Sequence, residues 1–155
     1  MRRDCADAEW FEDYRVGDEF AGEPVSLSEP EIIEFARRYD AQWFHVDPVA
    51  ARESPYGGLI ASGMQSFAAV WGGLIRADFL NGRGLGGPGV ELQWLKPVRP
   101  GDTLATIARV VETKASQSRP DRGFVSFEIH VTNQDGELVM TFALKEMVRR
   151  RPGVA

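Results

Sequence analysis

The chain contains two histidines, and His45 is the one expected just beyond a helix end, with an acidic residue on each side. In the segment YDAQWFHVD, Asp40 lies five residues before His45 and Asp47 lies two residues after it. A carboxylate beside an imidazole forms a pair that can hold and deprotonate a water near neutral pH. A strand would place residues five apart on opposite faces, so we expect a loop beyond a helix end to turn Asp40 and His45 toward one water. The alternative is that Asp40 caps a turn and His45 is a half-buried side chain with satisfied hydrogen bonds.

A second candidate group is a backbone N–H in the segment GGLIASGMQ. Gly63 is expected at the first position of a helix, where its N–H has no partner within the helix and no side chain blocks a ligand. The positive end of the helix dipole suits an oxygen that becomes negative in a transition state. The alternative is that this is an ordinary capped helix N-terminus without a ligand, since most helices have a capped N-terminus.

Two short segments must position Asp40 and His45. Ser28 lies three residues before Glu31, which is the spacing of a capping box, and an amphipathic helix is expected from there to about Asp40. The dipeptide Asp47-Pro48 predicts the start of a short second helix. The turn residues SPYGG at 54–58 must end it.

The longest apolar helix is expected to begin at SGMQ, because Ser62 and Gln65 have the spacing of a second capping box. Gly72 and Gly73 each cost this helix about 1 kcal/mol relative to Ala. Some other part of the chain should therefore pack closely against its backbone. The apolar residues that recur at three- and four-residue intervals are Met64, Phe67, Ala68, Trp71, Leu74 and Ile75.

Beyond a glycine-rich loop at 81–89, the pattern changes to alternation typical of strands, with an Asp135-Gly136 hairpin turn before the last of them. His130 falls on a polar strand face, where we expect it to be solvated or at an interface. The apolar face of the sheet must be covered, and the helix from Met64 to about Ala77 can cover it. This predicts an α+β fold, with an antiparallel sheet wrapped around a central helix. The strand-like segments are residues 90–94, 104–111, 125–131 and 138–144.

Length and composition limit the class of protein. A chain of 155 residues corresponds to about one domain, so residues 1–155 are expected to form a single domain. Hydrophobic residues make up 43% and charged residues 26%, which argues against disorder. The net charge of −5 argues against nucleic-acid or anionic-membrane partners. Cys5 is the only cysteine and no apolar run is long enough for a membrane span, so a cytoplasmic protein is expected.

Together, YDAQWFHVD and GGLIASGMQSFA resemble the MaoC-like family of acyl-CoA hydratases and dehydratases, relatives of the (R)-specific enoyl-CoA hydratases with the hotdog fold. The resemblance covers roughly residues 28–142 and includes the segment LKPVRPGDTL. The hydratase motif reads Asp, any residue, Asn, Pro, any residue, His. Asp40 and His45 match its ends, whereas Gln42 and Trp43 replace Asn and Pro. Trp43 is expected to narrow the pocket.

The family resemblance implies roles for three residues. Asp40 and His45 would hold the catalytic water, and the Gly63 N–H would bind the thioester carbonyl oxygen. Ser62 stands where a His often precedes that glycine. The implied reaction is hydration of trans-2-enoyl-CoA, or the reverse dehydration of 3-hydroxyacyl-CoA. Neither cofactor nor metal is implied, although coordination of a metal by Asp40, His45 and Asp47 is an alternative.

Two other functions stay open. One is a non-catalytic acyl-thioester-binding hotdog domain, and the other is a hotdog acyl-CoA thioesterase. The absence of Asp and Glu between Met64 and Ile75 counts against thioesterases that carry a carboxylate in mid-helix.

The expected partners are an acyl-CoA thioester and a second copy of the chain. A hotdog sheet has exposed edges, so a homodimer or a dimer of dimers is expected. The C-terminal run at 149–151 is expected to be a frayed tail. Four arginines in or near the strand region are candidate phosphate contacts, although a solvated surface charge is the simpler interpretation of each: Arg99, Arg109, Arg119 and Arg122.

Overall fold

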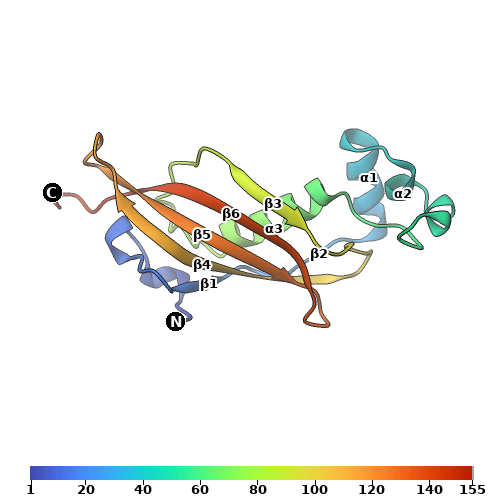
Figure 1. Ribbon diagram of the computed structural model, residues 1–155, viewed down its shortest axis with the longest axis horizontal. Helices are drawn as coiled ribbons and strands as arrows, with labels where there is room; N and C mark the ends of the chain where they lie inside the picture. The colour runs from blue at the N-terminus through green and yellow to red at the C-terminus, as the bar shows by residue number, and fades with distance from the viewer. Residues whose placement is uncertain (155) are drawn as a thin grey trace.

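The computed structural model describes residues 1–154, which form an antiparallel sheet with a long helix on one face (Figure 1). The sheet has the order β1-β4-β5-β6-β3, and β2 pairs with β4 beside β1. The predicted α+β class is confirmed. The strands are β1 (Glu19–Ala21), β2 (Val25–Ser26), β3 (Val90–Trp94), β4 (Thr103–Ala115), β5 (Arg122–Thr132) and β6 (Leu138–Arg149).

Three α-helices accompany the sheet: α1 (Glu29–Tyr39), α2 (Trp43–Val46) and α3 (Gly63–Arg76). The predicted capping box of α1 is confirmed, because the Ser28 N–H donates to the Glu31 carboxylate at 2.8 Å and the Glu31 N–H donates to the Ser28 hydroxyl at 3.4 Å. Short 3₁₀ turns lie at Cys5–Asp7, Phe11–Asp13 and Ala50–Glu53.

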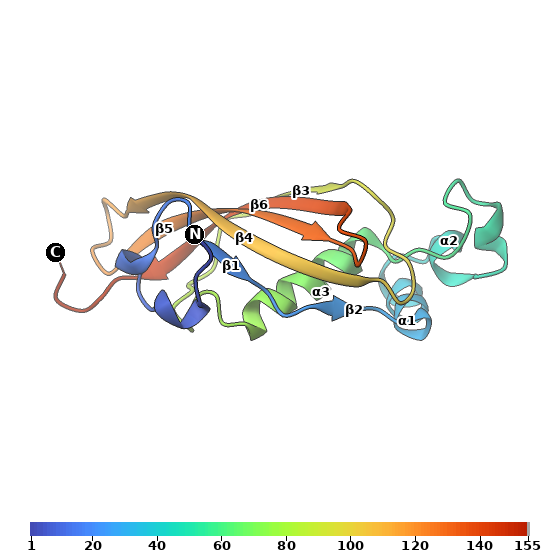
Figure 2. The ribbon, with the colours of Figure 1, turned by 90° about the horizontal axis from the view of Figure 1, so that it is seen from below.

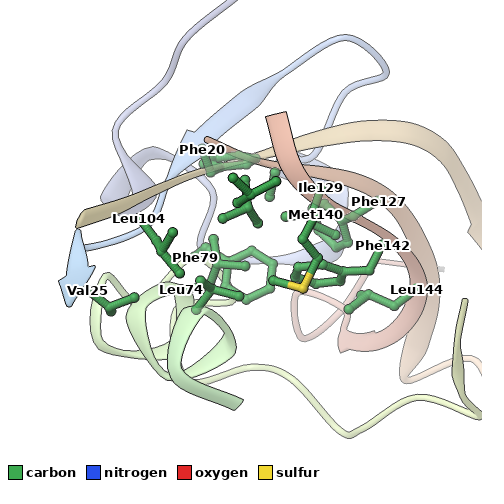
Figure 3. Close-up of a cluster of buried hydrophobic side chains, with 14 of the residues drawn as sticks. Phe20, Val25, Leu74, Phe79, Leu104, Phe127, Ile129, Met140, Phe142 and Leu144 are labelled. Atoms are coloured by element: carbon green, nitrogen blue, oxygen red, sulfur yellow. The ribbon is translucent and has the colours of Figure 1, made fainter. Parts of the chain in front are cut away.

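Helix α3 runs along the concave side of the sheet, as Figure 2 shows. Its Val70 and Leu74 side chains are fully buried against the inward-facing residues of the sheet, among them Phe127 and Ile129 of β5 (Figure 3). Each such apolar side chain contributes about 1.5–3 kcal/mol when it is fully buried. This packing fixes the position of α3, and with it the position of Gly63 at its first residue.

The predicted close packing on the α3 backbone is confirmed at Gly73. Its carbonyl oxygen accepts a hydrogen bond of 3.0 Å from the Glu23 N–H, in the segment between β1 and β2. A β-carbon on Gly73 would lie 2.5 Å from the Glu23 carbonyl oxygen, well inside contact distance. At Gly72 the nearest atom belongs to the Arg76 side chain of the same helix.

Several local predictions were wrong. The one-turn helix α2 occupies residues 43–46, where a loop was expected. The helix predicted from Asp47-Pro48 is the 3₁₀ turn Ala50–Glu53, and the Asp47 carboxylate accepts from the N–H groups of Val49 and Ala50. Strands β1 and β2 were not predicted, because each is too short to show a period.

The C-terminal basic run is not a frayed tail over its described residues. Arg150 donates to the Glu12 carboxylate at 2.7 Å, and Arg151 lies 3.2 Å from Asp13. The run therefore ties the end of β6 to the 3₁₀ turn at Phe11–Asp13. Within residues 1–154, no helix combines the length and the apolar character that a membrane span requires.

Candidate active site

The junction between α1 and α2 places Asp40 and His45. The Asp40 N–H closes the last turn of α1 on the Ala36 carbonyl at 2.8 Å, and the Gln42 N–H then bonds to the Asp40 carbonyl at 2.8 Å. This tight turn leads into α2, which carries His45 at its third position. A helical turn, and not the loop we expected, brings His45 back toward Asp40. The two side chains approach to 3.5 Å between Asp40 Oδ2 and His45 Nε2.

The hydrogen bonding of His45 selects one form of its neutral ring. The ring is buried, with 4% of the residue exposed, and its Nδ1 lies 2.7 Å from the Ile60 carbonyl oxygen. A carbonyl oxygen only accepts, so Nδ1 must carry the proton and donate. In the neutral imidazole, Nε2 is then an acceptor that faces Asp40 Oδ2. A water beside this pair, on the pocket side, could donate one hydrogen to each acceptor and keep its oxygen lone pairs free.

The Asp40 carboxylate is held by two neutral donors. Gln42 Nε2 donates to Oδ1 at 2.9 Å, and the Ser62 hydroxyl donates to Oδ2 at 2.7 Å. The hydrogen bond from Gln42 has the largest effect and lowers the pKa of Asp40 from its usual value; burial opposes it, and the hydrogen bond from Ser62 lowers the pKa further. Asp40 is therefore an ionised acceptor near neutral pH.

The capping box predicted for Ser62 and Gln65 is wrong. Ser62 is the N-cap of α3 but makes no side-chain cap, and its hydroxyl is turned toward the charged Asp40 carboxylate, to which it donates. A hydrogen bond to a charged acceptor is stronger than one between neutral groups. Gln65 bonds instead to the Glu31 carbonyl at 3.0 Å and links α3 to α1. The N–H of Gly63, the first residue of α3, has no acceptor among residues 1–154.

Trp94, at the end of β3, covers Gly63. A β-carbon on Gly63 would lie 2.5 Å from Nε1 and 2.8 Å from Cδ2 of this indole. With the ring in this position only glycine fits beneath it, so contact with Trp94 accounts for the glycine without any ligand. Trp94 itself is 52% exposed and ends an unpaired sheet edge, which leaves the indole free to move on the solvent side.

Asp40, His45 and Gly63 line one pocket of about 540 Å³. This volume falls in the range that small-molecule sites commonly have. Trp43 does not line the pocket. It is half exposed and packs edge-on against Phe44, so the expectation that Trp43 narrows the pocket is wrong. The apolar wall residues include Phe44, Tyr56, Ile60, Met64, Leu95 and Val98.

The remaining candidates lie elsewhere. Asp47 is outside this pocket, and its carboxylate caps the Ala50–Glu53 turn. His130 is exposed on β5, in register with Ile107 and Thr141, as expected for a residue on the polar face. Across residues 1–154, no three or more His, Cys, Asp or Glu side chains are grouped so that they could hold a metal ion.

Among the cationic candidates, Arg99 is the one beside the pocket. Its guanidinium donates to the carbonyl oxygen of the lining residue Tyr56 at 2.6 Å. Arg122 is paired with Asp121 at 2.9 Å, and Arg109 lies on β4 in register with Glu19.

Sequence reasoning missed two contributors to the site. Ser62 was treated as a cap, although its place one residue before the candidate glycine could have suggested contact with a ligand group. Trp94 was counted only as a strand residue, and no local signal places it over Gly63, because residues 31 apart in the sequence meet there through the tertiary fold.

Comparison with known proteins identifies the family. Residues 13–132 match the MaoC like domain, and the chain therefore belongs to the MaoC-like family. It is 39% identical to a MaoC-like dehydratase from Rhodospirillum rubrum, whose crystal structure matches with a TM-score of 0.87 over 92% of this chain and 98% of that one. The R-hydratase PhaJ1 from Pseudomonas aeruginosa is 25% identical, with a TM-score of 0.71 over 92% of this chain and 86% of that one. The predicted hotdog fold is confirmed.

A curated relative adds a further activity to the comparison. Mesaconyl-CoA hydratase from Cereibacter sphaeroides is 32% identical over 150 residues, or 94% of this chain. The chain spans only 43% of the length of that relative. These similarities place the chain in a family of hydratases and dehydratases.

Proposed function

We propose that this protein adds water to the double bond of a trans-2-enoyl thioester, or removes it from the 3-hydroxyacyl thioester in the reverse direction. The observation that carries the proposal is the pair of acceptors, Asp40 Oδ2 and His45 Nε2, held 3.5 Å apart in a pocket that also contains the start of α3. With Nε2 as an acceptor, a water beside the pair can donate one hydrogen to each of these two atoms.

The proposed reaction follows from these groups. Asp40 and His45 orient the water and take one of its protons as the oxygen bonds to Cβ. The electron pair of the double bond moves toward the thioester carbonyl, and the resulting negative oxygen accepts from the free Gly63 N–H at the positive end of α3. The same acid/base pair returns a proton to Cα, so one water is added in total.

Access to the Gly63 N–H requires Trp94 to shift, since its indole covers that residue. This same contact favours a second candidate, a non-catalytic acyl-thioester-binding domain in which Trp94 holds the start of α3 closed. A thioesterase is less well supported. Helix α3 has neither Asp nor Glu from Gly63 to Arg76, so it offers no carboxylate for attack at the carbonyl carbon.

One assay separates the three functions. Crotonyl-CoA is incubated with the protein while the enoyl absorbance and free thiol are both followed. A hydratase removes the absorbance without releasing thiol, a thioesterase releases thiol, and a binding domain does neither. Unchanged absorbance at high protein concentration, with crotonyl-CoA bound in a calorimeter, would overturn the proposed activity in favour of the binding domain.

We propose that the chain assembles as a homodimer or a dimer of dimers through β3. This strand is an edge of the sheet, and Val90 and Leu95, at and just beyond its ends, are exposed apolar residues. Met64 and Ile75 on α3 are also exposed. Pairing of two β3 edges would satisfy the free backbone groups and cover apolar surface. A sedimentation mass of one 17.2 kDa chain at micromolar concentration would contradict this assembly.

The carrier end of the substrate would leave the pocket past Lys96 and Arg99. Lys96 lines the pocket and is paired with Glu137, whereas Arg99 forms no ion pair with any described residue. Arg99 is thus the better candidate for a phosphate contact. The lone thiol of Cys5 supports a reducing compartment such as the cytoplasm.

A further inference from the structure

A second pocket lies at the opposite end of α3 from Gly63. It has a volume of about 440 Å³ and lies between the last turns of α3 and the glycine-rich loop at 82–87. The loop is fixed to β6, since the Leu85 N–H donates to the Met147 carbonyl at 2.7 Å and the Met147 N–H donates to the Gly86 carbonyl at 2.9 Å. This pocket shares no residue with the one that contains Asp40 and His45.

The base of this second pocket carries a buried carboxylate. Glu146 lies on the inner face of β6, in register with the fully buried Val125, and only 7% of the residue is exposed. Among residues 1–154, its side chain has neither a hydrogen-bond donor nor a cationic partner. Burial alone raises its pKa from the usual value. The Glu146 oxygens are not among the side-chain atoms that are fully shielded from solvent, and Glu146 lines the pocket, so a ligand in the pocket can reach an acceptor that no described residue occupies.

The surrounding residues keep the Glu146 carboxylate accessible from the pocket. A β-carbon on Gly87 would lie 2.9 Å from Glu146 Oε1, so a larger residue in the loop would press on the carboxylate. The other carboxylate that lines the pocket is Asp78, of which Oδ1 already accepts from the Gly82 N–H at 2.8 Å. Trp71, Ile75 and Leu80 provide apolar walls, and no Lys, Arg or His side chain of the described chain lines the pocket.

We propose that this pocket, which we call the Glu146 pocket, binds a cationic group on an apolar stem, an ammonium or guanidinium. The cation would pair with the Glu146 carboxylate, with Asp78 nearby, while the stem packs on Trp71 and Ile75. The Trp71 ring also offers a π face to a cation. A phosphate or carboxylate ligand does not fit, since two carboxylates and no base line the pocket.

Two sources can supply this cation. One is a free alkylamine, and the other is a Lys or Arg side chain of a second copy of the chain. A second copy of the chain could reach this pocket, because Ile75 lines the pocket and is also part of the exposed α3 surface that we propose for assembly. Both sources require the same charge on Glu146.

The first arm of the test uses n-butylammonium as the probe and n-butanol as its uncharged counterpart, at constant ionic strength. We expect n-butylammonium to raise the melting temperature of the full-length protein more than n-butanol does, since a ligand bound to the folded state stabilises it. Glu146→Gln keeps the shape and removes the charge, and should weaken n-butylammonium binding by about tenfold or more. Glu128→Gln, on the solvent face of β5, is the matched control and should bind as the wild type does.

The second arm compares the sedimentation masses of the wild type and the two variants. A lower mass of Glu146→Gln alone, with unchanged circular dichroism, assigns the cation to a second copy. Binding of n-butylammonium with unchanged masses assigns it to a free amine. The proposal is overturned if n-butylammonium and n-butanol act alike on the wild type while all masses agree, or if Glu146→Gln binds n-butylammonium as tightly as Glu128→Gln does. None of these outcomes depends on enoyl hydration, so the proposed activity can fail independently.

Discussion

The buried polar side chains near the two ends of α3 differ in their hydrogen bonding. At the N-terminal end, Asp40 accepts from Gln42 and Ser62, and His45 Nδ1 donates to the Ile60 carbonyl. At the C-terminal end, Glu146 is as buried as His45 but has no described partner. Hydrogen bonds at the first end fix the orientation of the side chains before any substrate arrives, whereas the second end carries a carboxyl group without a described partner. We therefore expect removal of polar groups to cost activity at the first end and to gain stability at the second.

The largest effect is expected from the acid/base pair. Asp40→Asn and His45→Ala should each lower turnover of crotonyl-CoA by about a hundredfold or more, within the range that positioned acid/base groups contribute. Asp40→Asn should change the melting temperature little, whereas His45→Ala removes a buried ring and its hydrogen bond to Ile60, so circular dichroism must show that this variant is folded at the assay temperature. Turnover close to that of the wild type in either variant would remove the acid/base assignment.

The next effect concerns the backbone donor at Gly63. Gly63→Pro deletes the N–H, and proline is compatible with the first helical position, where Ser62 already has the extended ψ of 136° that a residue before proline prefers. Both Gly63→Pro and Gly63→Ala introduce a carbon that collides with Trp94. They should therefore be compared in a Trp94→Ala background, where we expect Pro to be slower than Ala by about 10²-fold.

In that comparison, Gly63→Ala is the control for the added carbon, and circular dichroism checks that α3 persists. Equal rates for the Pro and Ala variants would show that the glycine serves the contact with Trp94 and not an oxyanion.

A smaller effect is expected at Ser62. Ser62→Ala removes one of the donors that lower the pKa of Asp40, so that pKa should rise toward its usual value. The acid limb of the pH–rate profile should move to higher pH, and turnover near neutral pH should fall by about tenfold, as expected when a carboxylate is held less well. Ser118→Ala, at an exposed position outside the pocket, is the control, and a profile of Ser62→Ala that overlays it would exclude this positioning role.

The smallest effect is expected at the other end of α3. The pKa of Glu146 is raised by burial, so the ionised form opposes folding and the protein gains stability as pH falls through that raised pKa. Glu146→Gln removes this charge. Its melting temperature at pH 8 should exceed that of the wild type by about 1–3 °C, with a smaller difference at pH 5. A variant that is less stable at pH 8 would mean that Glu146 has a cationic partner in the assembled protein.

Much of this protein is determined by local pattern. The capping box at Ser28, the α3 stripe and the alternation in β4, β5 and β6 predicted these elements, because each is long enough for its period to appear. The spacing of Asp40 and His45 in the sequence, with the family resemblance, also predicted that these two side chains would lie together.

The tertiary structure decided the details that make the site. Ser62 bonds to Asp40 and not to its own helix, because the fold brings a charged acceptor 22 residues away in sequence within 2.7 Å. Trp94 reaches Gly63, and the 82–87 loop closes over Glu146, only because the sheet curves around α3. The periodicity of a segment predicts whether that segment is a helix or a strand. It does not predict which distant segments will contact each other, and these contacts join distant segments. Only the packed sheet and helix together determine them.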